Sequence, residues 1–135
     1  MVEPMVASLA PSRRTDRDLA DLEDALAALR ASVGPDATAQ VDADLAFHTA
    51  LLQAAHNELL TGMATAIEIG MRLRDHYTHG SLDSNAVDLH ARVLLAVRNR
   101  RPRAAQTAMR ELIEQSIVDT ESSAAATDAD STAGA

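Results

Sequence analysis

The sequence predicts an all-α protein folded as a single antiparallel bundle of about six helices. It has 135 residues, a length that suits one domain with one core. Hydrophobic residues make up 47% of the chain and aromatic residues only 1%, so Leu, Ala, Val, Ile and Met must build that core. Ala and Leu are strong helix formers, and the large apolar residues recur at spacings of three and four, which favours helices over strands.

Two helices are expected in the first third of the chain. Residues 2–10 form a short apolar segment that should be helical and end at Pro11. Thr15 resembles a helix N-cap, because acidic residues follow it in the first turn, where the helix dipole favours negative charge. The helix that it begins should end at Gly34-Pro35, and its apolar stripe consists of Leu19, Leu22, Leu26, Leu29 and Val33.

Two more helices are predicted for residues 38–56 and 58–77. The second of them is apolar nearly all round, and a helix without a clean polar face is usually central in its bundle. A loop rich in Gly, Ser, Asp and Asn should follow at residues 80–85.

The last two helices are expected at residues 86–98 and from Pro102 to about residue 118. After Asp119 the sequence has no large apolar residue and therefore nothing to bury. We expect residues 1–118 to form the helical domain and residues 119–135 to form a disordered tail.

Charge and composition argue against several classes of protein. A formal net charge of -8 disfavours direct nucleic-acid binding, because phosphate contacts need clustered cations. The basic segment at residues 98–103 is a local exception, which we interpret as a helix-capping connection with solvated arginines rather than a nucleic-acid patch. No apolar run approaches the roughly 18 residues of a membrane span, and the sequence has no cysteine. We expect no signal peptide, because Glu3 and Pro4 are the wrong start for one. The sequence therefore predicts a cytoplasmic protein.

Three ionisable residues fall on helix stripes that should face the core. Asp44 and His48 are four residues apart and so share one helix face, and His90 occupies an inward position of the helix at 86–98. Buried without partners, these groups would be costly. A divalent cation bound by one carboxylate and two imidazoles is one solution. The alternative is a set of hydrogen bonds, from Asp44 to His48 within the helix and from His90 to a carbonyl or a buried water.

The remaining polar candidates have simpler explanations. Arg72 has Glu68 four residues before it, which indicates a surface ion pair. Arg74 shares a side with apolar residues, so it could either reach solvent or bind a buried anion. Three histidines fall at or near helix ends and are better explained there than as ligands: His56, His76 and His79. The chain has no phosphate-binding glycine loop and no HExxH motif, so we do not expect an enzyme.

Two segments resemble the signatures of a known family. Asp44-Leu45-Ala46-Phe47-His48, followed by Asn57-Glu58-Leu59-Leu60, is similar to the D-x-x-F-H motif and the Asn-marked helix end of FCD domains. His90-Ala91-Arg92-Val93, followed by Ala96-Val97, Ala104 and Met109, resembles the second signature of that family. The resemblance spans about residues 2–117. FCD domains are the C-terminal helical halves of FadR-like GntR transcription regulators.

The resemblance implies a sensing function. Domains of this family bind a small carboxylate effector, often with a divalent metal. Three of the family's four metal ligands are matched, by Asp44, His48 and His90, whereas Leu112 stands where the fourth, a His, is usual. This pattern implies either a weakened three-ligand site for Zn or Ni or a site that has lost its metal. The residues expected to bind the effector are Asn57 and one of Arg72 or Arg74.

The resemblance also suggests what this chain would not do. The family carries a winged helix-turn-helix before the helical domain, nothing here resembles one, and residues 1–12 are too few to hide it. We expect a homodimeric sensing half that does not bind DNA by itself. Two alternatives stay open: a structural dimerisation bundle without metal, and a metal-dependent enzyme that uses the coordination position left open at Leu112.

Overall fold

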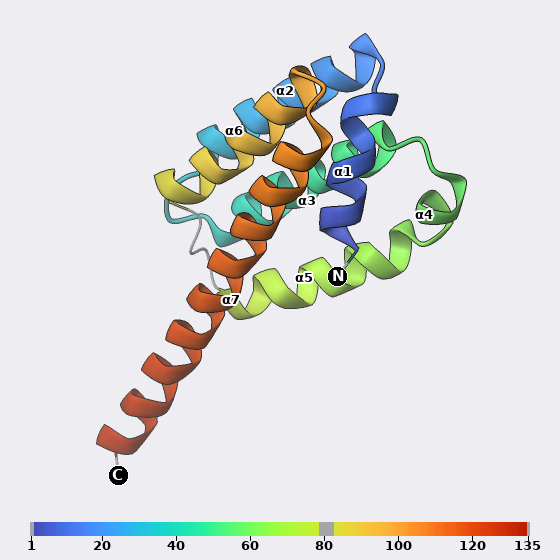
Figure 1. The fold of residues 1–135 in the computed structure, drawn as a ribbon. Coiled ribbons are helices and arrows are strands. Elements are labelled where there is room, and N and C mark those ends of the chain that lie inside the picture. Colours follow the sequence, from blue (N-terminus) through green and yellow to red (C-terminus); the bar gives the residue numbers. More distant parts are fainter. Residues whose placement is uncertain (1, 79–82, 135) are drawn as a thin grey trace.

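The computed structural model describes residues 2–78 and 83–134, and within them it contains seven α-helices and no strand. Figure 1 shows the helices packed into one bundle, with the last of them extending beyond it. Their bounds are α1 Glu3–Arg13, α2 Asp16–Ala31, α3 Ala37–Ala54, α4 Glu58–Gly62, α5 Ala64–Thr78, α6 Ser84–Arg98 and α7 Pro102–Ala133. The predicted all-α bundle is confirmed.

The core forms where α3 meets its neighbours and where α7 meets α1 and α6. α3 packs against α1, α2 and α5, whereas α6 packs against α2 and α7. The side chains at the centre are aliphatic apart from one phenylalanine, as the composition requires. The largest that are completely buried include Phe47, Leu22, Leu29, Leu51, Met109, Val93 and Val97.

α2 begins where the sequence predicted, and two hydrogen bonds at its N-terminus explain why. The Thr15 hydroxyl accepts a hydrogen bond from the Asp18 backbone N–H at 3.1 Å. The Asp18 carboxylate accepts one from the Thr15 backbone N–H at 2.8 Å. The two bonds form a reciprocal capping box, which satisfies N–H groups that the first helical turn leaves unpaired.

The prediction that α1 ends at Pro11 was wrong, because the helix continues to Arg13. A proline removes one helical N–H, but this one lies close to the helix end, where only one bond is lost. The next turn still closes, since the Arg14 N–H donates to the Ala10 carbonyl at 2.8 Å.

The single helix predicted for residues 58–77 is divided in two. α4 ends at Gly62, and Met63 separates it from α5. The predicted central position was also wrong: α5 lies along one side of the bundle (Figure 1), where it packs against α3 and α7. Its inner residues include the buried Met71, whereas Ile69 and Leu73 are exposed. A helix that is apolar nearly all round therefore lies at the surface of this chain, with the charged Glu68 and Arg72 exposed on it.

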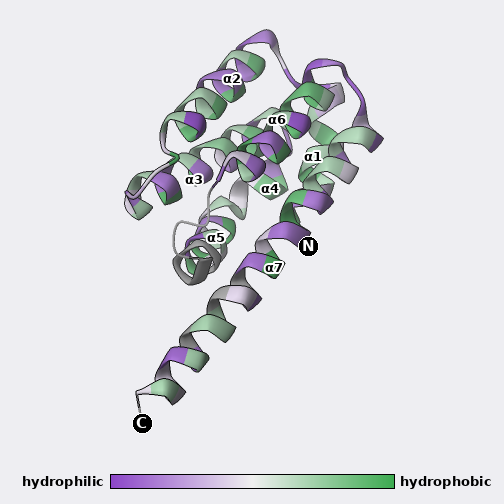
Figure 2. Ribbon diagram, turned by 90° about the vertical axis from the view of Figure 1, so that its left-hand side faces the viewer, coloured by the Kyte–Doolittle hydropathy of each residue, from purple (hydrophilic) through white to green (hydrophobic). Residues whose placement is uncertain are grey.

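α7 is longer than the sequence indicated. It continues from Pro102 to Ala133, where we expected a disordered tail after Asp119. The alanines of this segment favour a helical conformation without burial. Figures 1 and 2 show the extension projecting away from the bundle, and its described side chains from Glu121 onward are exposed.

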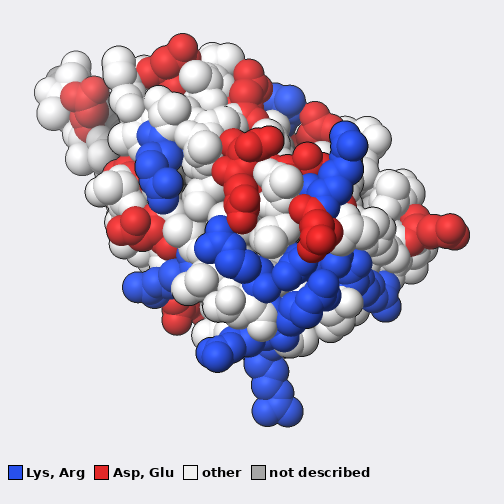
Figure 3. Space-filling view, turned by 90° about the horizontal axis from the view of Figure 1, so that it is seen from above, with Lys and Arg blue, Asp and Glu red and all other residues white. Residues whose placement is uncertain are grey.

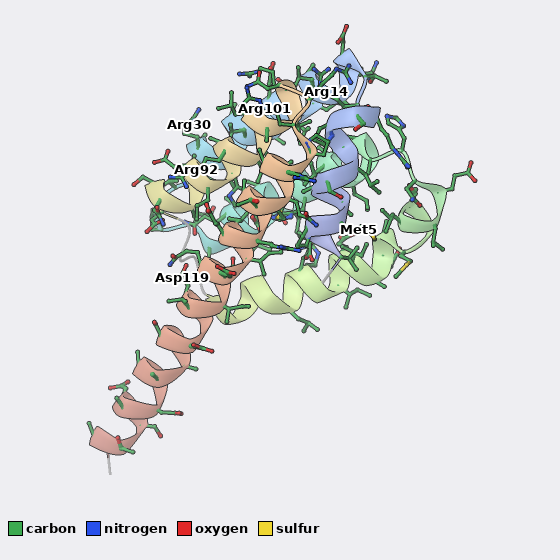
Figure 4. All side chains as sticks on the ribbon, in the orientation of Figure 1. Met5, Arg14, Arg30, Arg92, Arg101 and Asp119 are labelled. Carbon is green, nitrogen blue, oxygen red and sulfur yellow. The ribbon has the colours of Figure 1, made fainter. Side chains whose placement is uncertain are left out.

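At one end of the bundle, arginine side chains donate hydrogen bonds to carbonyl groups at the ends of neighbouring helices. Arg14 donates to the carbonyl of Val97 at 3.0 Å and to that of Arg98 at 2.8 Å, at the C-terminus of α6. Arg100 donates in return to the Pro11 carbonyl of α1 at 3.1 Å. Figure 3 shows arginines gathered on this end of the molecule, and Figure 4 places Arg14 and Arg101 there. The capping role expected for the basic segment 98–103 is thus confirmed for Arg100.

Among the described residues, no helix is both long enough and apolar enough to cross a membrane.

Candidate metal centre

The structure brings together the three inward-facing residues predicted from the sequence. Asp44 and His48 lie one turn apart on α3, and His90 reaches them from α6. All three are buried, with exposed fractions of 9% for Asp44, 5% for His48 and 2% for His90. Each offers one ligand atom, and these atoms lie within 4.8 Å of one another. The cluster is thus buried, and its ligand atoms come from two helices, α3 and α6.

His90 is held in place by hydrogen bonds on both sides of its ring. Its Nδ1 lies 2.7 Å from the Ala86 carbonyl oxygen, one turn earlier in α6. A carbonyl oxygen only accepts, so Nδ1 carries the hydrogen, and in the neutral ring Nε2 then presents a lone pair. That lone pair points at Asp44 Oδ1, 2.8 Å away. The contact is favourable when the ring is protonated or when a cation binds both atoms.

His48 is the least satisfied member of the cluster. Its Nε2 lies 3.5 Å from Asp44 Oδ1, too far for a good hydrogen bond. Neither of its ring nitrogens has a hydrogen-bond partner among the residues that the structure describes. A buried polar atom without a partner typically costs about 1–3 kcal/mol. A ligand that accepts the nitrogen lone pair would remove that cost.

Asp44 carries the negative charge of the site. Burial tends to raise the pKa of its carboxyl, but the charges of the His48 and His90 rings and the hydrogen bond with His90 outweigh that effect and hold the pKa well below its usual value. Asp44 is therefore ionised at neutral pH, as a metal ligand must be.

The donor set fits a borderline divalent cation such as Zn or Ni. Tetrahedral zinc with bonds of 2.0–2.1 Å places its ligand atoms roughly 3.3 Å apart, which is within the spread of the three atoms here. The Ala86 carbonyl holds His90 by the nitrogen that would face away from the ion, the usual outer support of a ligating histidine. Phe47 packs edge-on against the His90 ring, with centroids 5.0 Å apart, and restricts its rotation.

One cavity adjoins the cluster, and a larger hollow lies next to that cavity. A cavity of about 60 Å³ lies beside His48 between α1, α3 and α5, and its lining includes Glu3 and Met71. An open hollow of about 670 Å³ lies over α2, α3 and α5 and includes Arg72. Thr49 and Glu68 line both. The small cavity has room for a few waters or one carboxylate group.

The other predicted site residues do not join the cluster. Asn57 is the N-cap of α4, where its side chain accepts from the Leu60 N–H at 3.2 Å. Arg72 is half-exposed, with Glu68 at 3.2 Å and Asp42 at 3.6 Å, as its expected surface pairing requires. The side chains of Arg74 and His76, and all of His79, lie outside the described residues. Leu112, where a fourth ligand was considered, is buried in α7.

Sequence reasoning missed two features near the site. The Ala86 carbonyl that orients His90 could have been found, because it lies four residues earlier on the same helix. The pairing of His56 with Asp18 at 2.5 Å joins residues 38 positions apart and had no local signal. That pair belongs to the α2 capping box rather than to the metal centre.

Comparison with known proteins identifies the family. The model of the FCD domain matches residues 1–115. The chain belongs to the FCD family. The galactonate operon transcriptional repressor of Escherichia coli strain K12 is 40% identical over 67 residues, which are 50% of this chain and 29% of that protein. The HTH-type transcriptional regulator LutR of Bacillus subtilis strain 168 is 45% identical over 60 residues, 44% of this chain and 27% of that protein.

A solved structure supports the same fold. McbR/YncC of E. coli superposes with a TM-score of 0.78 at 19% identity, covering 90% of this chain and 63% of that one. The matches to the galactonate repressor and to LutR each span less than a third of the relative's own length. The FCD domain expected from the two sequence signatures is thus confirmed.

Proposed function

We propose that this chain is the effector-sensing domain of a transcription regulator, and that it holds one divalent metal through Asp44, His48 and His90. The observation that carries the metal proposal is His48, a buried imidazole beside an ionised carboxylate, whose two nitrogens have no hydrogen-bond partner in the described part of the chain. The family membership and the two relatives, a transcriptional repressor and a transcriptional regulator, support the regulatory part.

A bound metal would supply positive charge and an open coordination position for an oxygen of the effector. Asp44 would neutralise part of that charge, and Phe47 and the Ala86 carbonyl keep the His90 ring in position. The cavity beside His48 is lined by Glu3 and Glu68, which repel a carboxylate. A carboxylate effector should therefore bind only when the metal is present.

Arg72 is the described cation best placed to help. Its guanidinium already pairs with two carboxylates, Glu68 at 3.2 Å and Asp42 at 3.6 Å. Glu68 also lines the cavity beside His48. An effector carboxylate that entered from the open hollow could take the place of one of these partners, because Arg binds carboxylates through the same planar fork. In a longer regulator, such binding would shift the population between two arrangements of the protein.

The 2.8 Å contact between His90 and Asp44 favours one competing function. Its length is that of a charge-assisted hydrogen bond, which a protonated His90 would make without any metal. The domain would then be a structural dimerisation bundle with a hydrogen-bonded polar cluster. It would show the same thermal stability in EDTA, in zinc and in small carboxylates.

Calorimetry on protein stripped with EDTA separates the two functions. We expect ZnCl2 or NiCl2 to bind with a stoichiometry near one per chain, and His48→Ala to abolish the signal. His56→Asn is the matched control, because His56 is a histidine outside the cluster and Asn tolerates its positive φ of 45°. Absence of binding to the wild-type chain, or equal binding by His48→Ala with native circular dichroism, would refute the metal site.

The effector is tested by a second titration. A panel of hydroxy acids and sugar acids, galactonate among them, is titrated into zinc-loaded protein and into the same protein in EDTA. We expect heat only from the zinc-loaded sample, and a weaker response from Arg72→Gln. Equal binding in EDTA would contradict the dependence on metal, and no binding by any acid would contradict the effector class.

A further inference from the structure

A groove of about 420 Å³ lies between α6 and α7, next to the turn that joins them. Its apolar lining consists of three alanines and one exposed leucine: Leu95, Ala96, Ala104 and Ala108. Its charged lining consists of three arginines and one glutamate: Arg92, Arg101, Arg103 and Glu111. We call these eight residues the α6–α7 groove. Because alanines dominate its apolar lining, the backbone of another helix can approach it closely.

The α6–α7 groove is basic in an acidic chain. Its arginines outnumber its one glutamate, whereas the whole chain carries a net charge of -8. Arg92 pairs with Glu111 at 3.2 Å, at the end of the groove farther from the turn. Arg101 and Arg103 lie at the turn, and their side chains have no hydrogen bond or ion pair within the described part of the chain. Figure 4 shows Arg92 and Arg101 separated along the length of α6.

The extension of α7, residues 119–133, has a complementary surface. Glu121 and Asp128 are seven residues apart, so they share one helix face and lie about 10 Å apart along the axis. Ala124 and Ala125 lie between them on that face, and all four side chains are exposed. The sequence has no Lys or Arg after Arg110. The extension thus presents carboxylates at both ends of a surface of small residues.

The groove and the extension also match in length. Residues 92 and 99 of α6 are seven positions apart, so the stretch from Arg92 to the turn is again about 10 Å long. A carboxylate at each end of the small-residue face can therefore reach a cation at each end of the groove. Charge-assisted pairs of this kind are directional, which fixes the position of one helix along the other.

The extension does not reach the groove of its own molecule. α7 is continuous from Pro102 to Ala133, so Asp128 lies about 30 Å beyond Ala108 along the same helix. Figures 1 and 2 show the extension pointing away from the bundle. An extension that occupies the groove therefore comes from a second copy of the chain.

We propose that the extension of α7 from one copy docks in the α6–α7 groove of another. One of its two carboxylates pairs with Arg92 and the other with Arg101 and Arg103, while the extension's alanines pack on those of the groove. The two copies use different surfaces, so the contact is heterologous and leads to chains or closed rings of molecules. It differs in this from a two-fold homodimer, and it needs neither metal nor effector.

Sedimentation velocity of the whole chain in EDTA tests the proposal. A contact of this size is weak, with a dissociation constant on the order of 0.5 mM, so the weight-average mass should roughly double between about 20 µM and about 0.5 mM chain. This rise should be seen in about 10 mM NaCl. It should disappear in about 1 M NaCl, where the screening length falls from about 30 Å to about 3 Å.

Charge reversals identify the two surfaces. The groove variant, Arg101→Glu with Arg103→Glu, should lose the rise in mass, and so should the extension variant, Glu121→Arg with Asp128→Arg. A chain with all four reversals should recover it, because opposite charges face each other again. Arg17→Glu with Arg30→Glu is the matched control: it changes the net charge as the groove variant does, at two exposed arginines of α2, and should keep the rise.

Cross-linking gives a second measurement, since the chain has no cysteine of its own. A short bis-maleimide should link Ala104→Cys to Ala125→Cys when the two variants are mixed, and should link neither variant to itself.

Three results would overturn the proposal. The first is a wild-type mass that does not rise with concentration. The second is a rise that persists in the extension variant, which would mean that another surface fills the groove. The third is a cross-link of Ala104→Cys to itself without one to Ala125→Cys, which would indicate a two-fold contact at the groove.

Discussion

Arg14 makes a strong prediction about stability, because a single buried side chain joins three helices. It lies between α1 and α2, and its Nε and Nη2 donate to the Val97 and Arg98 carbonyls at the end of α6. Arg14→Met keeps most of the aliphatic volume and removes both bonds. Hydrogen bonds to charged groups contribute about 1.5–3 kcal/mol each. One of the two is only partly buried, so we expect a loss of about 3 kcal/mol in the free energy of unfolding.

The assay is urea denaturation followed by circular dichroism, with a thermal scan as a check. For a chain of this length the entropy of unfolding is about 280 cal/mol/K, so a loss of 3 kcal/mol lowers Tm by about 10 °C. Arg30→Met is the control, since Arg30 is exposed on α2 (Figure 4), and it should change stability by less than about 0.5 kcal/mol. If Arg14→Met and Arg30→Met have the same stability, the reasoning about buried carbonyl capping is refuted.

Three further predictions concern other parts of the chain. Burial tends to raise the pKa of Asp18, but hydrogen bonds from Thr15 and His56 outweigh that effect and lower it. The ionised Asp18 carboxylate therefore stabilises the fold fully above the unfolded pKa of about 4, and this stabilisation is lost as pH falls through the lower folded pKa. Asp18→Asn should therefore cost about 1 kcal/mol in urea titrations at pH 6 and less at pH 3; a constant difference would contradict this. Removing residues 120–135 should change the free energy of unfolding, measured by urea denaturation, by less than about 0.5 kcal/mol, because the described side chains there are exposed; a larger loss would show that the extension packs. Leu112→His should tighten zinc binding roughly tenfold or more in calorimetry, as one added ligand bond worth at least 1.4 kcal/mol would; unchanged affinity would place residue 112 away from the ion.

Local features of the fold could be predicted from the sequence. The capping box at Thr15 and Asp18 involves residues three apart, so its chemistry is visible in the sequence itself. The division between α4 and α5 at Met63 had a weaker signal, the preceding Gly62, and the helical pattern on both sides concealed it. The length of α7 was underestimated because two features of the sequence conflict. The alanines after Asp119 favour a helix, whereas the lack of a large apolar residue there suggested that the segment would not fold.

Contacts distant in the sequence were only partly predictable. The contact between His90 and Asp44 was predictable although 46 residues separate them, because the helical periodicity places both side chains on faces toward the core. The bonds from Arg14 to the end of α6 span more than 80 residues and leave no periodic trace. Hydropathy also does not show which neighbours a helix packs against, and α5 was misplaced at the centre of the bundle for that reason.

The most direct test of the central claim is a crystal structure of the zinc-saturated protein with an anomalous difference map at the zinc edge. We expect one strong peak within bonding distance of a carboxylate oxygen of Asp44 and of ring nitrogens of His48 and His90. His90 Nδ1 should still donate to the Ala86 carbonyl. A map without a peak at that place, with His90 still hydrogen-bonded directly to Asp44, would contradict it.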